Sequence, residues 1–328
     1  MTGHFAVLLF ATILDRVVGD PPWLWRRIPH PVVAIGAVIS ALDGQLNDRR
    51  AAASVRRRNG VILAAVLVLG GLFLGLGLAS IFALFGLFGA LFEIALVAVF
   101  LAQKSLTDHV RAVREALAAR GLAAGRAEVA MIVGRDVSAL DEAGIVRAAI
   151  ESLAENASDG IVAPFFWYLV LGLPGLLVYK AINTADSMVG HLDARYRDFG
   201  WASARLDDLL NLVPARLTAW ALIRVSRLGG RATRKAAMAK VKRDAALHRS
   251  PNAGWPETAM GLALDLALGG PRRYGSDMID APVLNAGGRH GAAIADIDAA
   301  LDLTAKLFNR LIFVSGTAML LAGLASLA

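Results

Sequence analysis

The stretch that decides the fold runs from residue 61 to residue 103 and reads "VILAAVLVLGGLFLGLGLASIFALFGLFGALFEIALVAVFLAQ". It contains a single charged residue, Glu93. One membrane-spanning helix needs about 20 apolar residues, so this stretch is long enough for two. Glycines near its middle suit a turn or the close approach of two helices. The stretch therefore predicts a hairpin of two spanning helices.

Weaker apolar segments extend this pattern in both directions. Residues 161–182 and 208–228 are apolar but interrupted by proline, and residues 311–328 form an uninterrupted candidate. The N-terminal "MTGHFAVLLFATILDRVVGDPP" lacks the basic start and small-residue cleavage site of a signal peptide, so we expect a short membrane helix there. The expected total is about five spans, within a range of four to six.

Composition and charge agree with a membrane protein. Apolar residues make up 56% of the chain and charged residues 19%, and the net charge is +7. Lys and Arg gather beside the apolar segments, in blocks at 49–58, at 104–114 and from Arg224 onward, which is typical of cytoplasmic loops. Nucleic-acid-binding motifs are missing, so no nucleic-acid partner is expected. The chain has no cysteine, which excludes disulfides and thiolate chemistry.

Between the apolar segments the sequence keeps a helical period. Apolar residues recur at helical spacing in residues 106–117, 141–158 and 285–310, and no persistent alternation predicts a strand. The predicted fold class is all-α: a polytopic membrane protein with amphipathic helical loops and proline-broken segments that line a polar cavity. We expect one integral membrane domain over 1–328, with cytoplasmic helical segments at 104–160 and 229–310.

Three carboxylates stand where an amphipathic helix enters an apolar segment, in "ESLAENASDGIVAPFFW". Glu151, Glu155 and Asp159 are spaced four residues apart, so they share one face of an α-helix. A polar face opposite an apolar one is also what any surface helix shows. Three like charges at this spacing repel one another, and a bound cation or a basic side chain would relieve that repulsion. The pattern leaves both a solvated face and a site open.

A second group of polar residues lies in residues 179–220. Ionisable groups at a membrane border are costly unless they are paired or face water, so they are candidates for function. Carboxylates and amide oxygens are the ligands that Mg²⁺ prefers, and Mg²⁺ often binds substrate phosphates as well. The alternative is side-chain pairing and snorkelling at the interface. The residues are Lys180, Asn183, Asp186, Asp207, Asp208 and Asn211.

Two proline-rich turns place polar groups beside turn formers. "GDPPWLWRRIPHP" contains Asp20 and His30, and "HRSPNAGWPE" contains His248 and Glu257. Such isolated histidines are more often structural than catalytic. The chain shows none of the glycine-rich phosphate or dinucleotide loops, no zinc-protease motif and no hydrolase nucleophile elbow, so a nucleotide site is not placed by motif.

Taken together, five segments resemble the CobD/CbiB family of cobalamin-biosynthesis membrane proteins, the adenosylcobinamide-phosphate synthases. They are "GDPPWLWRRIPHPVVAIG", "GRDVSALDEAGIVRAAIESLAENASDGIVAPFFWY", "GLPGLLVYKAINTADSMVGH", "YRDFGWASARLDDLLNLVPARLTA" and "HRSPNAGWPETAMG". They follow one another in order over most of the chain. One departure is Asp265, which stands where the resemblance leads us to expect a neutral residue.

The resemblance implies an ATP-dependent, Mg²⁺-dependent ligase of the bacterial cytoplasmic (inner) membrane, with its active site facing the cytoplasm. It would join adenosylcobyric acid to (R)-1-aminopropan-2-ol phosphate, or to the free amino alcohol, to give adenosylcobinamide phosphate. Implied partners are the corrin, the amino alcohol phosphate, the lipid bilayer and other cobalamin-assembly proteins.

On this interpretation the candidate residues fall into three roles. The catalytic candidates are Glu151, Glu155, Asp159, Lys180, Asp186 and His248. The substrate-binding candidates are Arg135, Asn156, Asn183, Arg195, Arg205, Asn211, Asn252, Trp255 and Glu257. The metal-ligand candidates are Asp159, Asp186, Asp207 and Asp208. We expect Glu155, Asp159, Asn183 and Asp186 to converge on one cavity open to the cytoplasm.

Two other functions fit parts of the sequence. Helices broken by proline also occur in transporters, and a scaffold for corrin-handling proteins would need no catalytic site. A Mg²⁺-dependent membrane prenyltransferase would use acidic motifs that "NTAD" and "DDLLN" faintly resemble, although Gly190 stands where a second carboxylate is expected.

Overall fold

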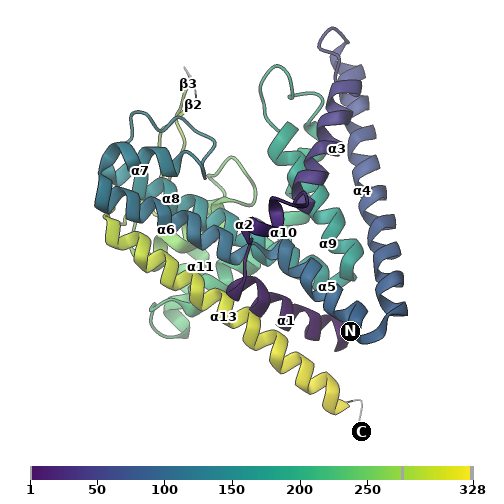
Figure 1. Cartoon of the computed structure of the whole chain (residues 1–328). Coiled ribbons are helices and arrows are strands. Elements are labelled where there is room, and N and C mark those ends of the chain that lie inside the picture. The colour runs from purple at the N-terminus through teal and green to yellow at the C-terminus, as the bar shows by residue number, and fades with distance from the viewer. Residues whose placement is uncertain (1, 275–276, 326–328) are drawn as a thin grey trace. The chain divides into compact units, whose positions relative to one another are not determined.

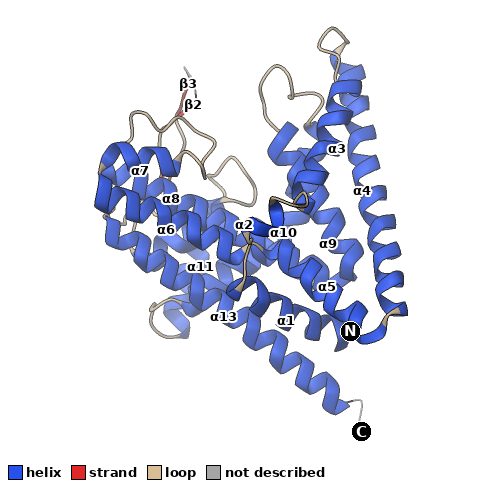
Figure 2. Ribbon diagram, in the orientation of Figure 1, coloured by secondary structure: helices blue, strands red, loops and turns tan. Residues whose placement is uncertain are grey.

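The structure is a computed structural model that describes residues 2–274 and 277–325, and most of these residues are helical (Figures 1 and 2). The chain divides into two compact units, and each unit is built from segments that are distant in sequence. The first unit comprises residues up to 102, residues 163–211 and residues from 312 onward, and the second comprises residues 103–162 and 212–311.

The first unit contains the long apolar helices. Its elements are α1 (Thr2–Val17), α2 (Pro22–Trp25), α3 (Pro31–Leu46), α4 (Ala53–Leu84), α5 (Gly86–Leu101) and α9 (Ala163–Val189), with the first half of α10 (Trp201–Val225) and the end of α13 (Ile294–Ala325).

The second unit contains shorter helices and two small sheets. Its elements are α6 (Gln103–Arg120), α7 (Leu122–Val129), α8 (Glu142–Ala157), the π-helical turn η1 (Ser158–Val162), α11 (Arg231–Ala245), α12 (Gly254–Leu264), β1 (Leu268–Gly269), β2 (Arg272–Tyr274), β3 (Asp277–Ile279) and β4 (Val283–Leu284), with the rest of α10 and α13. β1 pairs with β4 and β2 pairs with β3, both antiparallel. Strands of two or three residues are too short to show the period of two, so the sequence pattern did not reveal them.

The predicted hairpin and fold class are confirmed. α4 ends at Leu84 and α5 begins at Gly86, whose φ of +53° is a left-handed conformation that glycine adopts at no steric cost. Within residues 2–274 and 277–325, four helical stretches are long and apolar enough to cross a membrane, and α3 is a shorter apolar helix. The four stretches are Ala53–Leu84, Gly86–Arg120, Glu142–Val189 and Ile294–Ala325.

The prediction for residues 208–228 needs a qualification. These residues are helical in α10, but α10 is not among the four helical stretches that meet the length and hydropathy requirement. Charged side chains interrupt its apolar run, among them Asp208, Arg216 and Arg224. The helix predicted within residues 285–310 and the span predicted from residue 311 onward form one continuous helix, α13 (Ile294–Ala325).

Close packing of α4 against α9 explains glycines in the first predicted span. A Cβ added at Gly75 would lie 2.4 Å from Pro174 Cα, and one at Gly71 would lie 2.9 Å from Val178 N. No side chain fits at either distance, so the glycines allow the two backbones to approach. α9 itself is kinked at Gly172, whose φ is +65°, just before Pro174.

The core of the second unit surrounds α8. Ile145, Ile150 and Leu153 on α8 are fully buried, together with Val110 on α6 and Leu307 on α13. Burial of each such side chain contributes about 1.5–3 kcal/mol. A helix that is buried on most sides holds its polar residues in fixed positions, and this is how α8 places Glu151.

Candidate functional site

A polar cavity lies in the second unit, beside the C-terminal half of α8. Its volume is about 120 Å³. Its lining comes from the loop after α7, from α8 and from α12. The loop and α8 contribute four predicted site residues, Arg135, Glu151, Glu155 and Asn156, and α12 contributes a fifth, Glu257. The lining residues are Ile132, Val133, Gly134, Arg135, Ala148, Glu151, Ser152, Glu155, Asn156 and Glu257.

Glu151 joins two loops at this cavity. Arg135 Nη2 lies 2.9 Å from Glu151 Oε2, and both side chains are nearly inaccessible, at 10% and 6% exposure. The backbone N–H of Gly269 in β1 donates to Glu151 Oε1 at 2.6 Å. Arg135 also carries a buried Nε–H that has no hydrogen-bond partner among the described residues. Glu151 thus holds the Arg135 guanidinium in place, and the Arg135 Nε–H has no hydrogen-bond partner among the described residues.

Glu257 forms another wall of the cavity. It is 1% exposed and belongs to the first turn of α12. His248 Nε2 lies 3.7 Å from Glu257 Oε1, and His248 Nδ1 accepts a hydrogen bond from Ser250 N at 3.0 Å. The Ser250 N–H fixes the imidazole so that Nε2 faces the carboxylate. The proline-rich turn therefore presents a histidine–carboxylate pair, which is a group able to accept or give up a proton.

The rest of this turn is held by an arginine that the sequence interpretation did not select. Arg216 Nη1 donates to Asn252 Oδ1 at 3.0 Å and to Leu212 O at 2.7 Å. Its guanidinium lies over the ring of Trp255, 4.6 Å from the ring centroid. Asn252 and Trp255 are thus engaged by Arg216 and shape the turn that carries His248. An arginine inside an apolar segment was the signal that could have identified it.

A π-helical turn separates Asp159 from the other two predicted carboxylates. η1 (Ser158–Val162) follows α8 directly, so the four-residue spacing of an α-helix does not continue from Glu155 to Asp159. Exposure also differs along the series: Glu151 is buried, Glu155 is exposed and Asp159 is intermediate. π-helical turns occur frequently at functional sites. The hydroxyl of Ser158 in this turn is buried without a hydrogen-bond partner among the described residues.

A second polar cluster lies in the first unit, around Asp207 at the start of α10. Asn183 Nδ2 donates to Asp207 Oδ1 at 3.2 Å, and Asn211 Nδ2 donates to Asp207 Oδ2 at 3.0 Å. Tyr179 Oη donates to Asn211 Oδ1 at 3.0 Å. These contacts bring together four residues of two motifs, and Tyr179 is the one that the sequence interpretation missed.

The charge state of Asp207 is unusual. Burial, followed by repulsion from the negative charge of Asp186, raises the pKa of Asp207 to about 7. Asp207 and the nearby Asp186 are two carboxylates, and Mg²⁺ is commonly bound by one or two carboxylates plus substrate phosphates. Within the described residues, no group of three or more acidic or histidine side chains is placed to hold a metal ion. The cluster thus fits a metal that a substrate phosphate helps to hold.

The remaining predicted residues lie elsewhere. Lys180 is 8% exposed in the interior of α9. Arg195 donates to the buried Asp43 of α3, and the exposed Arg205 lies 3.7 Å from Asp208 on the same helix. Arg195 is therefore part of a structural ion pair, and Arg205 of a surface pair, which contributes little to stability.

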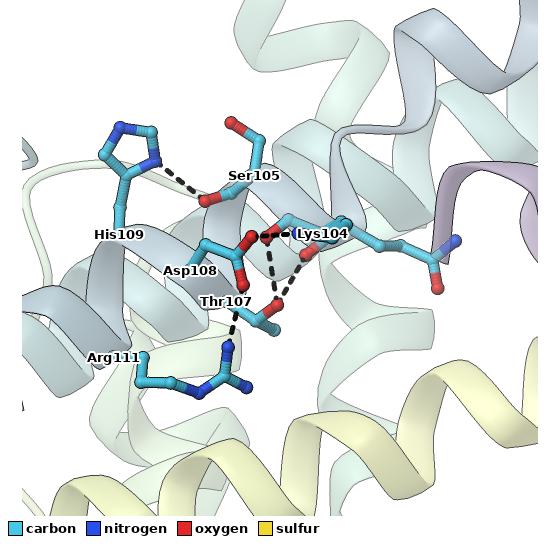
Figure 3. Close-up of polar contacts among 7 residues, drawn as sticks. Lys104, Ser105, Thr107, Asp108, His109 and Arg111 are labelled. Carbon is cyan, nitrogen blue, oxygen red and sulfur yellow. Dashed lines mark hydrogen bonds and ion pairs between the residues drawn. The ribbon is translucent and has the colours of Figure 1, made fainter. Parts of the chain in front are cut away.

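Polar contacts within α6 engage two of the basic residues that follow the hairpin, Lys104 and Arg111. Figure 3 shows Lys104 and Arg111 both bonded to Asp108, one helical turn away on either side. His109 Nδ1 lies 2.7 Å from Ser105 O in the same helix. All of these contacts are local to α6, as expected for the polar face of a helix.

The comparison with known families covers most of the chain. A model of the CobD/Cbib protein family matches residues 8–304. The chain belongs to the CobD/CbiB family. Residues of both clusters lie within the matched range, from Arg135 to Glu257.

Curated relatives align with this chain over most of their length. The chain is 53% identical to the cobalamin biosynthesis protein CobD of Brucella suis biovar 1 over 321 residues, which covers 97% of this chain and 98% of the relative. It is 53% identical to CobD of Rhizobium meliloti over 297 residues, with 90% of each chain covered. It is 48% identical to CobD of Rhodobacter capsulatus over 284 residues, covering 86% and 87%. No solved structure matches the chain.

Proposed function

We propose that this chain catalyses amide formation between a propionate carboxylate of adenosylcobyric acid and the amine of (R)-1-aminopropan-2-ol phosphate, giving adenosylcobinamide phosphate. Membership of a cobalamin-biosynthesis family supports the pathway. The observation that carries the reaction type is the cavity that holds Arg135, Glu151 and the almost fully buried Glu257. Buried charged groups are costly, and polar groups that converge on a cavity are candidates for binding or catalysis.

The reaction sets two chemical demands. A carboxylate does not react with an amine until it is activated, most simply as an acyl phosphate, so that the carboxylate oxygen leaves with inorganic phosphate. The second demand is that the ammonium lose a proton before it attacks. ATP would supply the phosphoryl group, and bound Mg²⁺ would neutralise phosphate charge. The amine therefore requires a side chain that accepts a proton, and the nucleotide requires side chains that bind Mg²⁺ and phosphate.

The cluster in the first unit suits the phosphate side of the reaction. Asp186 and Asp207 would hold Mg²⁺, and Asn183 and Asn211 keep the Asp207 carboxylate oriented through the hydrogen bonds described above. The nearly buried Lys180 on the same helix as Asp186 is the cation that we assign to a phosphate oxygen.

The cavity in the second unit suits the amine side. Glu257, with His248 beside it, would accept the proton that the ammonium releases. The basic blocks that flank the apolar helices support an orientation with the loops and the site on the cytoplasmic side of a bacterial inner membrane, where ATP and corrin are available.

The direct test uses the full chain, purified and reconstituted into lipid vesicles. With ATP, Mg²⁺, adenosylcobyric acid and aminopropanol phosphate, we expect adenosylcobinamide phosphate by mass spectrometry, and none when any single component is omitted. Failure of the complete mixture to give product would remove the ligase proposal and favour a transporter or scaffold. Transfer of a prenyl group from a prenyl diphosphate would instead favour the prenyltransferase.

A further inference from the structure

An apolar groove with a volume of about 620 Å³ lies in the first unit, between α4 and α10. Val61, Ala65 and Leu69 line it from α4, and their spacing of four residues places them on one face of that helix. All three side chains are exposed. They belong to Ala53–Leu84, which is long and apolar enough to cross a membrane. Because lipid tails are as apolar as leucine, an acyl chain is a suitable occupant of such a groove.

The wall of the groove that comes from α10 is not purely apolar. Leu209 continues the apolar lining, and Trp201 stands at the first position of the helix. Among the described lining residues Arg205 is the charged one, and 67% of its side chain is exposed. Tryptophan is enriched where membranes meet water, and arginine extends its charge toward that boundary while its carbon stem covers apolar surface. We therefore expect the Trp201 end of the groove to lie at the membrane surface.

A second arginine stands at this end of the groove. Arg57 lies about one helical turn before Val61 on α4, and its Cζ is 3.9 Å from the centroid of the Trp201 ring. Asp208, 3.7 Å from Arg205 in a surface pair, offsets one of the two arginine charges. The Trp201 end of the groove therefore carries more positive than negative charge, beside an apolar lining. This combination is complementary to a molecule with an anionic head and an apolar tail.

We propose that this groove binds a phospholipid with a negatively charged headgroup. One acyl chain lies along the α4 and α10 walls, and the phosphate lies near Arg57 and Arg205. Basic pockets beside spanning helices on the cytoplasmic side of a membrane are typical sites for anionic headgroups, and the basic block at 49–58 supports that side for this end of α4. The proposal concerns a site separate from the two polar clusters and does not depend on the ligase reaction.

Trp201 allows a lipid to be detected at this groove, because bromine atoms on an acyl chain quench the fluorescence of a tryptophan that they contact. The full chain is reconstituted into phosphatidylcholine vesicles in which a rising share is replaced by brominated phosphatidylglycerol. The matched series uses brominated phosphatidylcholine with the same acyl chains. The chain has six tryptophans, so each protein is measured with and without W201F, and the difference is the Trp201 signal. Binding at Trp201 should favour phosphatidylglycerol about tenfold or more, since each arginine near a membrane surface favours anionic lipid about fivefold.

Two variants test the two ends of the lipid separately. R205Q should lower the preference for phosphatidylglycerol about fivefold, because one of the two cations is lost. A65F should lower the quenching by both lipids, because a larger side chain at this exposed position occupies the groove. The matched control is R111Q, which breaks a surface pair with Asp108 three residues away, as R205Q does with Asp208. This control should keep the preference of the wild type.

Equal quenching of Trp201 by the two lipids in the wild type would overturn the proposal. An equal loss of preference in R205Q and R111Q would also overturn it, since the effect would then be one of overall charge. Unchanged quenching in A65F together with an unchanged preference in R205Q would place the lipid outside the groove. Absence of quenching by either lipid would show that another occupant, such as a second copy of the chain, covers the groove, and the lipid site would be lost.

Discussion

The two polar clusters solve the problem of a buried carboxylate in different ways. Glu151 in the second unit faces a guanidinium and a backbone N–H. Asp207 in the first unit accepts from the side-chain amides of Asn183 and Asn211, and the nearby charge of Asp186 opposes its ionisation. The fixed Arg135 guanidinium compensates the charge of Glu151, whereas Asp207 accepts hydrogen bonds from two neutral amides. The comparison suggests a structural role for Glu151 and a ligand-binding role for Asp207.

The largest effect is expected from Glu151→Gln. Loss of the carboxylate leaves the Arg135 charge buried without its partner, which typically costs about 3–5 kcal/mol. Denaturant unfolding in detergent should show this loss. The control is Glu155→Gln on the same helix, an exposed site where the change should stay within about 0.5 kcal/mol.

A double variant sharpens this result. Replacing Arg135 by Gln together with Glu151 removes both charges, so the double variant should be more stable than the sum of the two single losses indicates. Strictly additive losses would mean that the pair observed at 2.9 Å does not stabilise the fold.

The next effect concerns pH and Asp207, which lies outside the four candidate spans. Its pKa of about 7 in the folded protein lies above the ordinary value of 3.8, so between these values the folded state holds a proton that the unfolded state has released. Stability should therefore fall as the pH rises from about 4 to about 7, by up to about 4 kcal/mol in total.

Asp207→Asn should remove most of this slope, because an amide does not titrate. The measurement is the unfolding free energy at a series of pH values for both proteins in detergent. A wild type whose stability rises over this pH interval, with the same slope in the variant, would show that Asp207 ionises normally and would end the contrast with Glu151.

A smaller effect is expected from Tyr179→Phe. The variant leaves the buried Asn211 Oδ1 without its donor at 3.0 Å, which should cost about 1–2 kcal/mol. Tyr196→Phe is the matched control, since its hydroxyl lies at the longer distance of 3.3 Å from Asp43 and is less buried. Equal losses in thermal unfolding of the two variants would indicate that the hydrogen-bond chain to Asp207 adds nothing.

Much of the fold follows from local patterns in the sequence. A run with Glu93 as its single charge predicts the α4–α5 hairpin, and helical spacing predicts α8. The motifs also identified Glu151, Asp207 and their neighbours as candidates. These features depend on residues within a few helical turns of one another, so a single sequence reveals them.

The pairing within each cluster could not be predicted in the same way. Glu151 meets Gly269, which is 118 residues away in sequence, and Asn183 meets Asp207 across 24 residues. Such contacts depend on how the helices pack, which periodicity does not determine. The π-helical turn at Ser158–Val162 changed the expected common face of Glu155 and Asp159, because no residue pattern distinguishes it from a continuing α-helix. The expected convergence of Asp159 with Asp186 stays a prediction.

The proposed ligase reaction is tested most directly by following one oxygen atom. Adenosylcobyric acid labelled with ¹⁸O in its free propionate carboxylate is supplied to the reconstituted wild-type chain with ATP, Mg²⁺ and aminopropanol phosphate. We predict adenosylcobinamide phosphate as product, with one ¹⁸O recovered in inorganic phosphate for each amide formed. No amide from the complete mixture, or amide without ¹⁸O in the released phosphate, would contradict activation of the carboxylate as an acyl phosphate by this chain.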